Sequence, residues 1–187
     1  MFDINKTVFR SKFFDMPFSG ARSAQIALSV MVIFCTILAS ILTTLTPLDA
    51  LIAGLIATFI FFASDVVHHY GHFLAAKQVG KRAIGVRFWW LFGTTRYPPN
   101  EGELTPTIHI RRAIGGPIIS MVVLIGFLFL GSFLWRFSDM ARFIIGWGIA
   151  VNAVWYVLGA LIPIGFANFA TDGMTILRAW QTQQKQS

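Results

Sequence analysis

Four long stretches of this sequence are dominated by apolar residues, and they constrain its fold more than any other feature. The stretches run over 24–45, 50–76, 113–135 and 143–171. Three of them carry no charged residue, and the second is interrupted by polar residues from Asp65 onward. A helix needs about 20 apolar residues to cross the core of a bilayer. The lengths predict four transmembrane helices, the last broken near Pro163 because proline removes a helix hydrogen bond.

The composition agrees with a membrane protein and disfavours a soluble enzyme. Hydrophobic residues make up 56% of the 187 residues and charged residues 12%, against roughly 45–50% and about 25% in soluble domains. A soluble fold of this size has too much surface for its volume to bury so much apolar area. The predicted fold class is therefore an all-α polytopic membrane protein with about four transmembrane helices.

The basic residues are unevenly distributed between the two sides of these predicted helices. Of the 15 Lys and Arg residues, 13 lie before the first stretch, between the second and third, or after the fourth, and two lie between the third and fourth. The positive-inside rule then places both termini in the cytoplasm. The net charge of +7 is explained by this sidedness, so we expect the lipid bilayer as a partner and no nucleic acid. The expected location is a prokaryotic plasma membrane.

Three parts of the chain differ in character. Residues 1–23 combine phenylalanines with Lys and Arg and predict a cytoplasmic amphipathic segment. Residues 24–180 form a single membrane-embedded domain, and 181–187 a polar tail. Within the domain, residues 84–97 are rich in β-formers and aromatics and are bounded by turn residues, which predicts a β-hairpin at the membrane surface between the second and third helices. An amphipathic surface loop is the alternative.

Three of the four histidines lie within five residues of one another. His68 and His72 are four residues apart, so on a helix they share one face. This spacing allows two imidazoles to bind one metal ion, and ionisable residues inside a spanning helix are costly and usually functional. The alternative is a set of interfacial histidines packed at a helix end.

The predicted topology brings a carboxylate to the same level of the membrane. His68 lies 20 residues after Leu48, about 30 Å along a helix, which places it near the cytoplasmic face. The fourth stretch runs in the same direction and ends near Asp172. Asp172 is thus a candidate third ligand in a His2Asp site that leaves one position for water. The alternative for Asp172 is a helix cap.

Three motifs make residues 50–179 resemble the site-2 protease class of intramembrane zinc metalloproteases, peptidase family M50. The segment HHYGHFLAA at 68–76 matches the family's H-E-x-G-H-x-x-A-A helix except at its second position. The pair GP at 116–117 resembles the family's A-G-P-x-x-N segment, and DG at 172–173 resembles the D-G motif. Ser120 stands at the position of the asparagine in the second motif.

This resemblance implies one zinc ion per chain, bound by His68, His72 and Asp172. It also implies cleavage of a transmembrane or membrane-proximal protein substrate. The strand predicted within 84–97 is then a candidate to pair with an unwound substrate by strand addition. Gly85, Val86 and Phe88 are the predicted substrate-binding residues.

The main departure from the family is His69, which replaces the catalytic glutamate. In the family this glutamate takes a proton from the attacking water and returns it to the leaving amine. Histidine is able to perform such a transfer, so His69 is the predicted catalytic residue. An inactive relative and an engineered change are alternatives. Three carboxylates are further candidates for the base: Asp65, Glu101 and Glu103.

A second departure concerns the family's N-x-x-P motif, whose asparagine is thought to stabilise the oxyanion. Ala160 occupies that position before Pro163. Asn168 is the predicted oxyanion stabiliser in its place, and Asn152 is a second candidate. Hydrogen bonding between helices is the alternative role for both.

Three functions are compatible with these features. The first is an intramembrane metalloprotease, and the second is an inactive, M50-like pseudoprotease that binds membrane proteins. The third is a small transporter or ion-binding bundle, which explains the histidines but leaves the GP and DG motifs unexplained.

Overall fold

The structure is a computed structural model that describes residues 3–166 and 169–186. Its helices are α1 (Arg22–Leu42), α2 (Pro47–Gln78), α3 (Pro106–Leu134), α4 (Asp139–Ala150), which continues as the π-helix η1 (Val151–Gly159), and α5 (Asp172–Gln186). Its strands are β1 (Thr7–Phe13), β2 (Met16–Ala21), β3 (Gly85–Trp89), β4 (Phe92–Arg96), β5 (Gly165–Phe166) and β6 (Phe169–Ala170).

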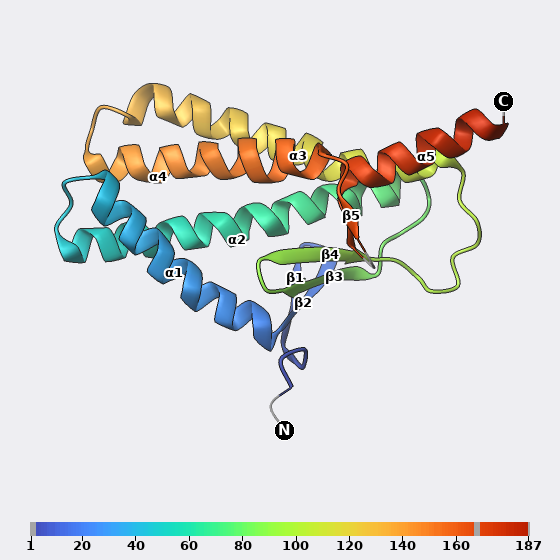
Figure 1. Ribbon diagram of the computed structural model, residues 1–187, viewed down its shortest axis with the longest axis horizontal. Coiled ribbons are helices and arrows are strands. Elements are labelled where there is room, and N and C mark those ends of the chain that lie inside the picture. The colour runs from blue at the N-terminus through green and yellow to red at the C-terminus, as the bar shows by residue number, and fades with distance from the viewer. Residues whose placement is uncertain (1–2, 167–168, 187) are drawn as a thin grey trace.

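The chain is mostly helical, with four helices long and apolar enough to cross a membrane. These are α1, α2, α3 and the continuous helix formed by α4 and η1, which confirms the four spans predicted from the sequence. The fourth helical path ends just before Pro163, as expected for a residue without an N–H donor. In Figure 1 the α1–α2 and α3–α4 connections lie at one end of the bundle, and the C-terminus lies at the other.

Small residues allow the helices to approach one another closely. A Cβ atom added to Gly71 of α2 would overlap the carbonyl oxygen of Gly115 in α3, and one added to Gly115 would lie 2.6 Å from the Cβ of Ala75. A Cβ on Gly54 would likewise collide with Thr36 of α1. Such contacts between small residues are typical of helix packing in lipid, where no hydrophobic force drives the helices together.

Four strands form a small sheet beside the helices, in the order β1-β2-β3-β4. β1 and β2 are antiparallel, β2 and β3 parallel, and β3 and β4 antiparallel. The hairpin predicted within 84–97 is therefore present as β3 and β4. The segment 7–21, for which only an amphipathic surface segment was predicted, forms a second hairpin, with Phe14 at its turn in the left-handed region (φ 51°).

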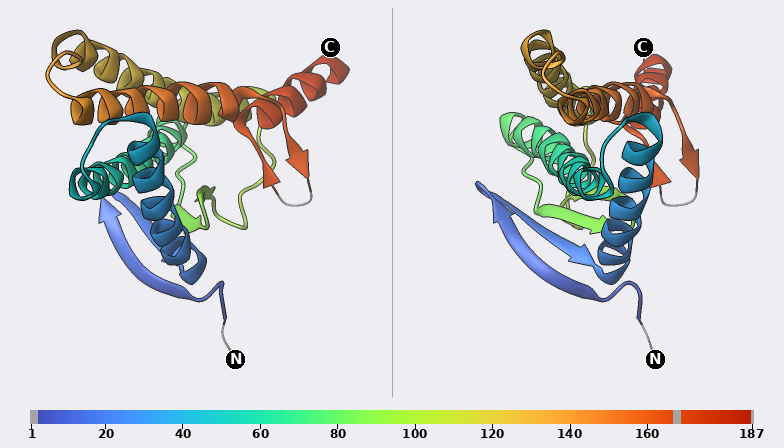
Figure 2. Two further views of the ribbon diagram at one scale, coloured as in Figure 1. Left: turned by 60° about the vertical axis from the view of Figure 1, so that its left-hand side comes forward. Right: turned by 90° about the vertical axis from the view of Figure 1, so that its left-hand side faces the viewer.

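One face of this sheet packs against the C-terminal turns of α2. Met16, Val86 and Phe88 are buried there in one cluster with Phe73 and Ala76 of α2. Figure 2 shows the sheet lying below α2 and beside α1 in both views. The packing brings β4 alongside the histidines of α2.

Candidate metal centre

The two candidate histidine ligands lie on one face of α2, four residues apart and both buried. The Nε2 atoms of His68 and His72 are 3.1 Å from each other. The i, i+4 spacing therefore produces the convergence that the sequence predicted.

Asp172 meets these histidines from α5, of which it is the first residue. Its Oδ2 lies 3.4 Å from Nε2 of His68, and its Oδ1 lies 3.4 Å from Nε2 of His72. The next residue is Gly173, where a Cβ would overlap the carbonyl oxygen of Leu161. Glycine is thus required for the chain to return from the β5–β6 hairpin and present Asp172.

The electrostatics of Asp172 favour its charged form. Burial opposes ionisation of the carboxyl, but the adjacent His72 and His68 more than offset this and hold the pKa of Asp172 well below its ordinary value. The carboxylate is therefore available as an anionic ligand at physiological pH.

The donor set and its spacing fit a divalent metal ion. One ligand atom from each of His68, His72 and Asp172 lies within 4.8 Å of the others. A tetrahedral zinc site with bonds of about 2.0 Å has edges of about 3.3 Å between its ligand atoms. The two histidine nitrogens are 3.1 Å apart, and each lies 3.4 Å from a different oxygen of Asp172. Two imidazoles and a carboxylate are also ligands that zinc accepts.

The opposite ring nitrogens are held by hydrogen bonds that orient the rings. Nδ1 of His72 donates to the carbonyl oxygen of Arg112 at 2.8 Å. A carbonyl can only accept, so this bond leaves the lone pair of His72 on Nε2, facing the centre. The 3.3 Å approach of the Gly116 N–H to the same Nδ1 is then a contact and not a hydrogen bond. Nδ1 of His68 pairs with the Ser120 hydroxyl at 2.9 Å.

Gly116 explains why the GP motif sits opposite the histidines. A Cβ added at this position would overlap Nε2 of His72 and lie 2.6 Å from Nε2 of His68. The backbone of α3 can therefore approach the two metal-facing nitrogens only because this residue is glycine.

The ring centre of His69 lies 5.3 Å from that of His68 and 5.6 Å from that of His72, but His69 has polar partners of its own. Its Nδ1 lies 3.0 Å from the Thr95 hydroxyl of β4. Its Nε2 lies 3.5 Å from Oδ1 of Asp65, one turn earlier on α2. A Cβ on Gly93 would collide with the same ring, so the sheet packs directly on His69. Sequence reasoning did not foresee the contact with Thr95, because it depends on how the sheet packs on α2.

The other candidates from the sequence fall in different places. Asn168 lies outside the described residues. Asn152 is fully buried and donates to Ser64 of α2 at 3.1 Å, which is a hydrogen bond between helices. Ala160 lines a cavity beside the centre. Glu101 accepts two hydrogen bonds from Arg112, whereas Glu103 is exposed.

The three predicted substrate-binding residues do not offer a free strand edge. Gly85, Val86 and Phe88 belong to β3, which is paired with β4 over its whole length and with β2 at Val86, Arg87 and Phe88. Val86 and Phe88 also point into the packed face of the sheet. Both neighbouring positions of β3 are therefore occupied, and within 84–97 it is β4 that has a free edge. Among the strands described, β4 is the edge strand nearest the histidines.

Two cavities meet at the candidate metal centre, and His69, His72 and Asp172 line both. One, of about 550 Å³, is lined by polar groups that include Thr95, Glu101 and His109. The other, of about 400 Å³, is lined mainly by apolar and aromatic side chains: Leu91, Phe92, Trp155, Tyr156, Ala160 and Ile164. The centre is thus reached from a polar side and from an apolar side.

A buried ion pair braces the polar cavity. Arg112 makes two 2.8 Å hydrogen bonds to Glu101 and donates to the carbonyl oxygen of Lys81 at 2.9 Å. Its guanidinium lies 3.7 Å from the centre of the Tyr97 ring. Burial raises the pKa of Tyr97 to about 12, so its phenol is neutral. Arg112 therefore ties the loop after β4 to α3, at the residue whose carbonyl orients His72.

The π-helix η1 packs a tyrosine against the same histidines. Tyr156 donates to the carbonyl oxygen of Phe61 at 3.1 Å, and its ring centre lies 5.4 Å from that of His68. π-Helical turns are rare and often occur at functional sites. The periodicity of the apolar residues gave no sign of this one.

Comparisons with known proteins support the fold. No protein-family model matches the sequence, and no curated protein sequence matches it. Among solved structures, the chain is similar to the site-2 protease from Methanocaldococcus jannaschii, with a TM-score of 0.58 and 21% sequence identity, over 96% of this chain and 73% of that one. The chain thus has a site-2 protease-like fold, and with its four apolar helices this indicates a multi-pass membrane protein.

Proposed function

We infer that this protein is an intramembrane zinc metalloprotease of the site-2 type, which hydrolyses peptide bonds in membrane-spanning substrates. The observation that carries this proposal is the meeting of His68, His72 and Asp172, from two helices far apart in the sequence, at the spacing of metal ligands. The likeness in fold supports it. The uneven distribution of Lys and Arg between the two sides favours both termini in the cytoplasm, and a prokaryotic plasma membrane is retained as the proposed location.

The three ligand residues would hold one zinc ion per chain, with the carbonyl of Arg112 and the hydroxyl of Ser120 fixing the imidazole rings. When bound, zinc polarises the scissile carbonyl and lowers the pKa of a water molecule. The polar cavity gives water a path to the centre. The apolar cavity on the other side is suited to substrate side chains.

We assign the role of proton acceptor to His69. The Thr95 hydroxyl lines the polar cavity and is hydrogen-bonded to Nδ1 of His69. A proton from water passes to the Thr95 oxygen while the hydroxyl proton moves to Nδ1. Asp65, beside Nε2, then stabilises the imidazolium, as the carboxylate does in serine-protease triads. Asp65 is a positioning residue in this scheme.

The substrate would pair with β4 instead of β3. β4 is an edge strand, and its residue Gly93 packs on His69, so an added strand would run past the centre. Asn168 is retained as the candidate oxyanion stabiliser, since it precedes Asp172 by four residues.

The test is cleavage of a transmembrane substrate in liposomes, with zinc supplied, by three forms: wild type, His69→Glu and Asp172→Ala. We expect cleavage by the wild type and by His69→Glu, and none by Asp172→Ala. Asp65→Asn should lower the rate about 100-fold without loss of zinc, within the range that general base catalysis contributes. Equal rates for the wild type and Asp172→Ala would overturn the proposal.

The second candidate is a pseudoprotease that binds membrane proteins. It is favoured by one observation: both ring nitrogens of His69 already have partners, Asp65 and Thr95. In the same assay, cleavage by His69→Glu but not by the wild type would establish this alternative.

A further inference from the structure

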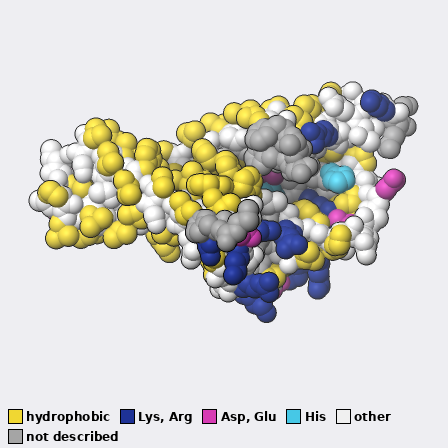
Figure 3. Space-filling view, turned by 60° about the horizontal axis from the view of Figure 1, so that its bottom comes forward, with side chains coloured by type: hydrophobic (Ala, Val, Ile, Leu, Met, Phe, Trp, Pro, Cys, Tyr) yellow, Lys and Arg dark blue, Asp and Glu magenta, His cyan; other side chains and the backbone are white. Residues whose placement is uncertain are grey.

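The face of the sheet that points away from α2 carries four cations. Arg10 and Lys12 lie on β1, Arg87 on β3 and Arg96 on β4. Cross-strand partners share a face of a sheet, and Met16, Val86 and Phe88 occupy the opposite, packed face. In Figure 3, Lys and Arg side chains gather on this part of the molecule, next to the apolar surface of the helices.

The register arranges the cations around a floor of small residues. In one row Ser19 pairs with Arg10 on one side and with Arg87 on the other. In the next row Lys12 pairs with Pro17, and Gly85 pairs with Arg96. Two strand spacings, or about 9.5 Å, separate Arg10 from Arg87, and three, or about 14 Å, separate Lys12 from Arg96. Small side chains between long basic ones leave a cavity of about 470 Å³, which all four cations line.

The charge of this cavity is uncompensated. Among the residues that the structure describes, no carboxylate lines it. The nearby Asp15 is paired with Lys77 at 2.8 Å. The side chain of Asp3 accepts a hydrogen bond from the backbone N–H of Asn5. One nitrogen of Arg87 donates to the carbonyl oxygen of Asn5 at 2.6 Å, which leaves other donors of the guanidinium for a ligand.

The cavity lies at the end of a membrane-spanning helix. Ser19 of its floor stands three residues before α1, or about 10 Å along the strand, and α1 exposes large apolar side chains along its length: Leu28, Val30, Ile33, Phe34, Ile37 and Ile41. The hydrocarbon core ends where such a stripe ends, and the headgroup layer begins there. An anion in this cavity therefore sits at the depth of lipid phosphates.

We propose that this cavity, bounded by Arg10, Lys12, Arg87 and Arg96, binds the phosphate of an anionic phospholipid whose acyl chains lie along α1. Arg pairs well with phosphate through its planar set of donors. Because the opposite face of the sheet packs on α2, the bound lipid would fix β4 beside His69. The inference rests on the placement in a membrane and not on protease activity, so either can fail without the other.

The test is a binding titration of the full chain in neutral detergent with short-chain phosphatidylglycerol and phosphatidylcholine. We expect saturable binding, at least tenfold tighter for phosphatidylglycerol. Each cation near an anionic lipid surface contributes about fivefold in affinity, so the double variant R10Q/K12Q should bind about 25-fold more weakly. Both side chains are exposed, so this variant is expected to fold even if R87Q/R96Q does not.

The matched control is K81Q/R82Q, which removes the same charge from exposed residues outside the cavity. It should bind phosphatidylglycerol as the wild type does. Equal affinity for the two lipids, or an equal loss of phosphatidylglycerol affinity in R10Q/K12Q and K81Q/R82Q, would contradict the proposed site. Binding of inorganic phosphate as tight as that of phosphatidylglycerol would overturn the lipid as its ligand.

Discussion

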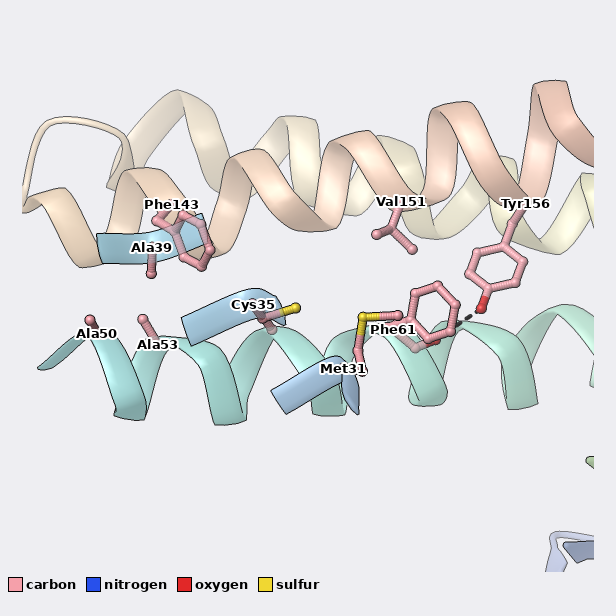
Figure 4. Close-up of a cluster of buried hydrophobic side chains, with 10 residues drawn as sticks. Met31, Cys35, Ala39, Ala50, Ala53, Phe61, Phe143, Val151 and Tyr156 are labelled. Atoms are coloured by element: carbon pink, nitrogen blue, oxygen red, sulfur yellow. Dashed lines mark hydrogen bonds between the residues drawn. The ribbon is translucent and has the colours of Figure 1, made fainter. Parts of the chain in front are cut away.

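The two halves of α2 perform different tasks, although they belong to one continuous helix. The N-terminal half contributes small apolar side chains such as Ala50 and Ala53, packed in one cluster with Ala39 and Phe143 (Figure 4). The C-terminal half buries ionisable groups instead, among them His68 and His72. The first half is held mainly by close packing, whereas the second half buries several ionisable groups, which cost free energy unless they have partners.

The partners in the C-terminal half come from all the elements around it. His72 is held by α3, His69 by β4, and Ser64 by η1. Within the part of the chain that is described, one oxygen of Asp65 is buried without a hydrogen bond, an arrangement that costs about 1–3 kcal/mol. Among the described residues, four further buried side-chain atoms also lack a hydrogen bond, on Thr36, Thr58, Arg112 and Asn152. The N-terminal half of α2 is thus expected to contribute packing and the C-terminal half chemistry. The following substitutions test this difference.

The largest effect is expected at Arg112. Arg112→Ala leaves Glu101 without its partner in a buried site, which should lower the free energy of unfolding by about 3–5 kcal/mol. Arg111→Ala, at the exposed neighbouring residue, should change it by less than about 0.5 kcal/mol. Thermal unfolding in detergent measures both. Equal stability of the two variants would show that the ion pair between Arg112 and Glu101 does not stabilise the fold.

Gly116→Ala tests the C-terminal half of α2 at its candidate metal ligands. The new Cβ would occupy the space of the two Nε2 atoms, so zinc affinity should fall about 100-fold, or about 2.7 kcal/mol. Gly126→Ala in the same helix meets nothing within 4 Å and should bind zinc normally. Competition with a chelator gives both affinities, and an unchanged affinity in Gly116→Ala would contradict the described geometry.

Ala53→Leu tests the N-terminal half, where only packing is expected to matter. Ala53 is fully buried, and overpacking should destabilise the protein by about 1–2 kcal/mol while zinc affinity stays within twofold. Leu55→Met, on the exposed side of the same helix, is the control. A large loss of zinc affinity in Ala53→Leu would show that the two halves are not independent.

The smallest effect concerns the exposed pair that joins the β1–β2 turn to the end of α2. A hydrogen bond from Lys77 lowers the pKa of Asp15. A lowered pKa in the folded state means that this pair stabilises the protein above the ordinary pKa of an aspartate and that the contribution disappears as the pH falls. The melting temperatures of wild type and Asp15→Asn should therefore differ slightly at pH 6 and converge near pH 3. A difference that grew toward low pH would contradict this sign.

The sequence predicted what depends on local spacing. Apolar runs located the four spans, the i, i+4 pair located His68 and His72, and the direction of the spans placed Asp172 at their level. The hairpin at β3 and β4 followed from β-forming residues between turn signals. The spans, the histidine pair and the hairpin are decided by residues close together in the chain, and the level of Asp172 follows from the direction of the spans.

Features that depend on distant residues could not be predicted in this way. The parallel pairing of β2 with β3 joins segments more than 60 residues apart, and it makes β3 an interior strand. The contact of Thr95 with His69 follows from that sheet, and the contact of the Arg112 carbonyl with His72 follows from helix packing. The π-helix η1 has no signature in its apolar pattern.

The most direct test of the metal centre is the zinc content of the purified protein, measured by mass spectrometry of the element after loading and removal of free metal. We expect one zinc per chain in the wild type and in His69→Ala. Almost none should remain in His68→Ala or Asp172→Ala, provided that these variants keep their helical content. A wild type that retains no zinc, or an Asp172→Ala variant that retains as much as the wild type, would contradict the account.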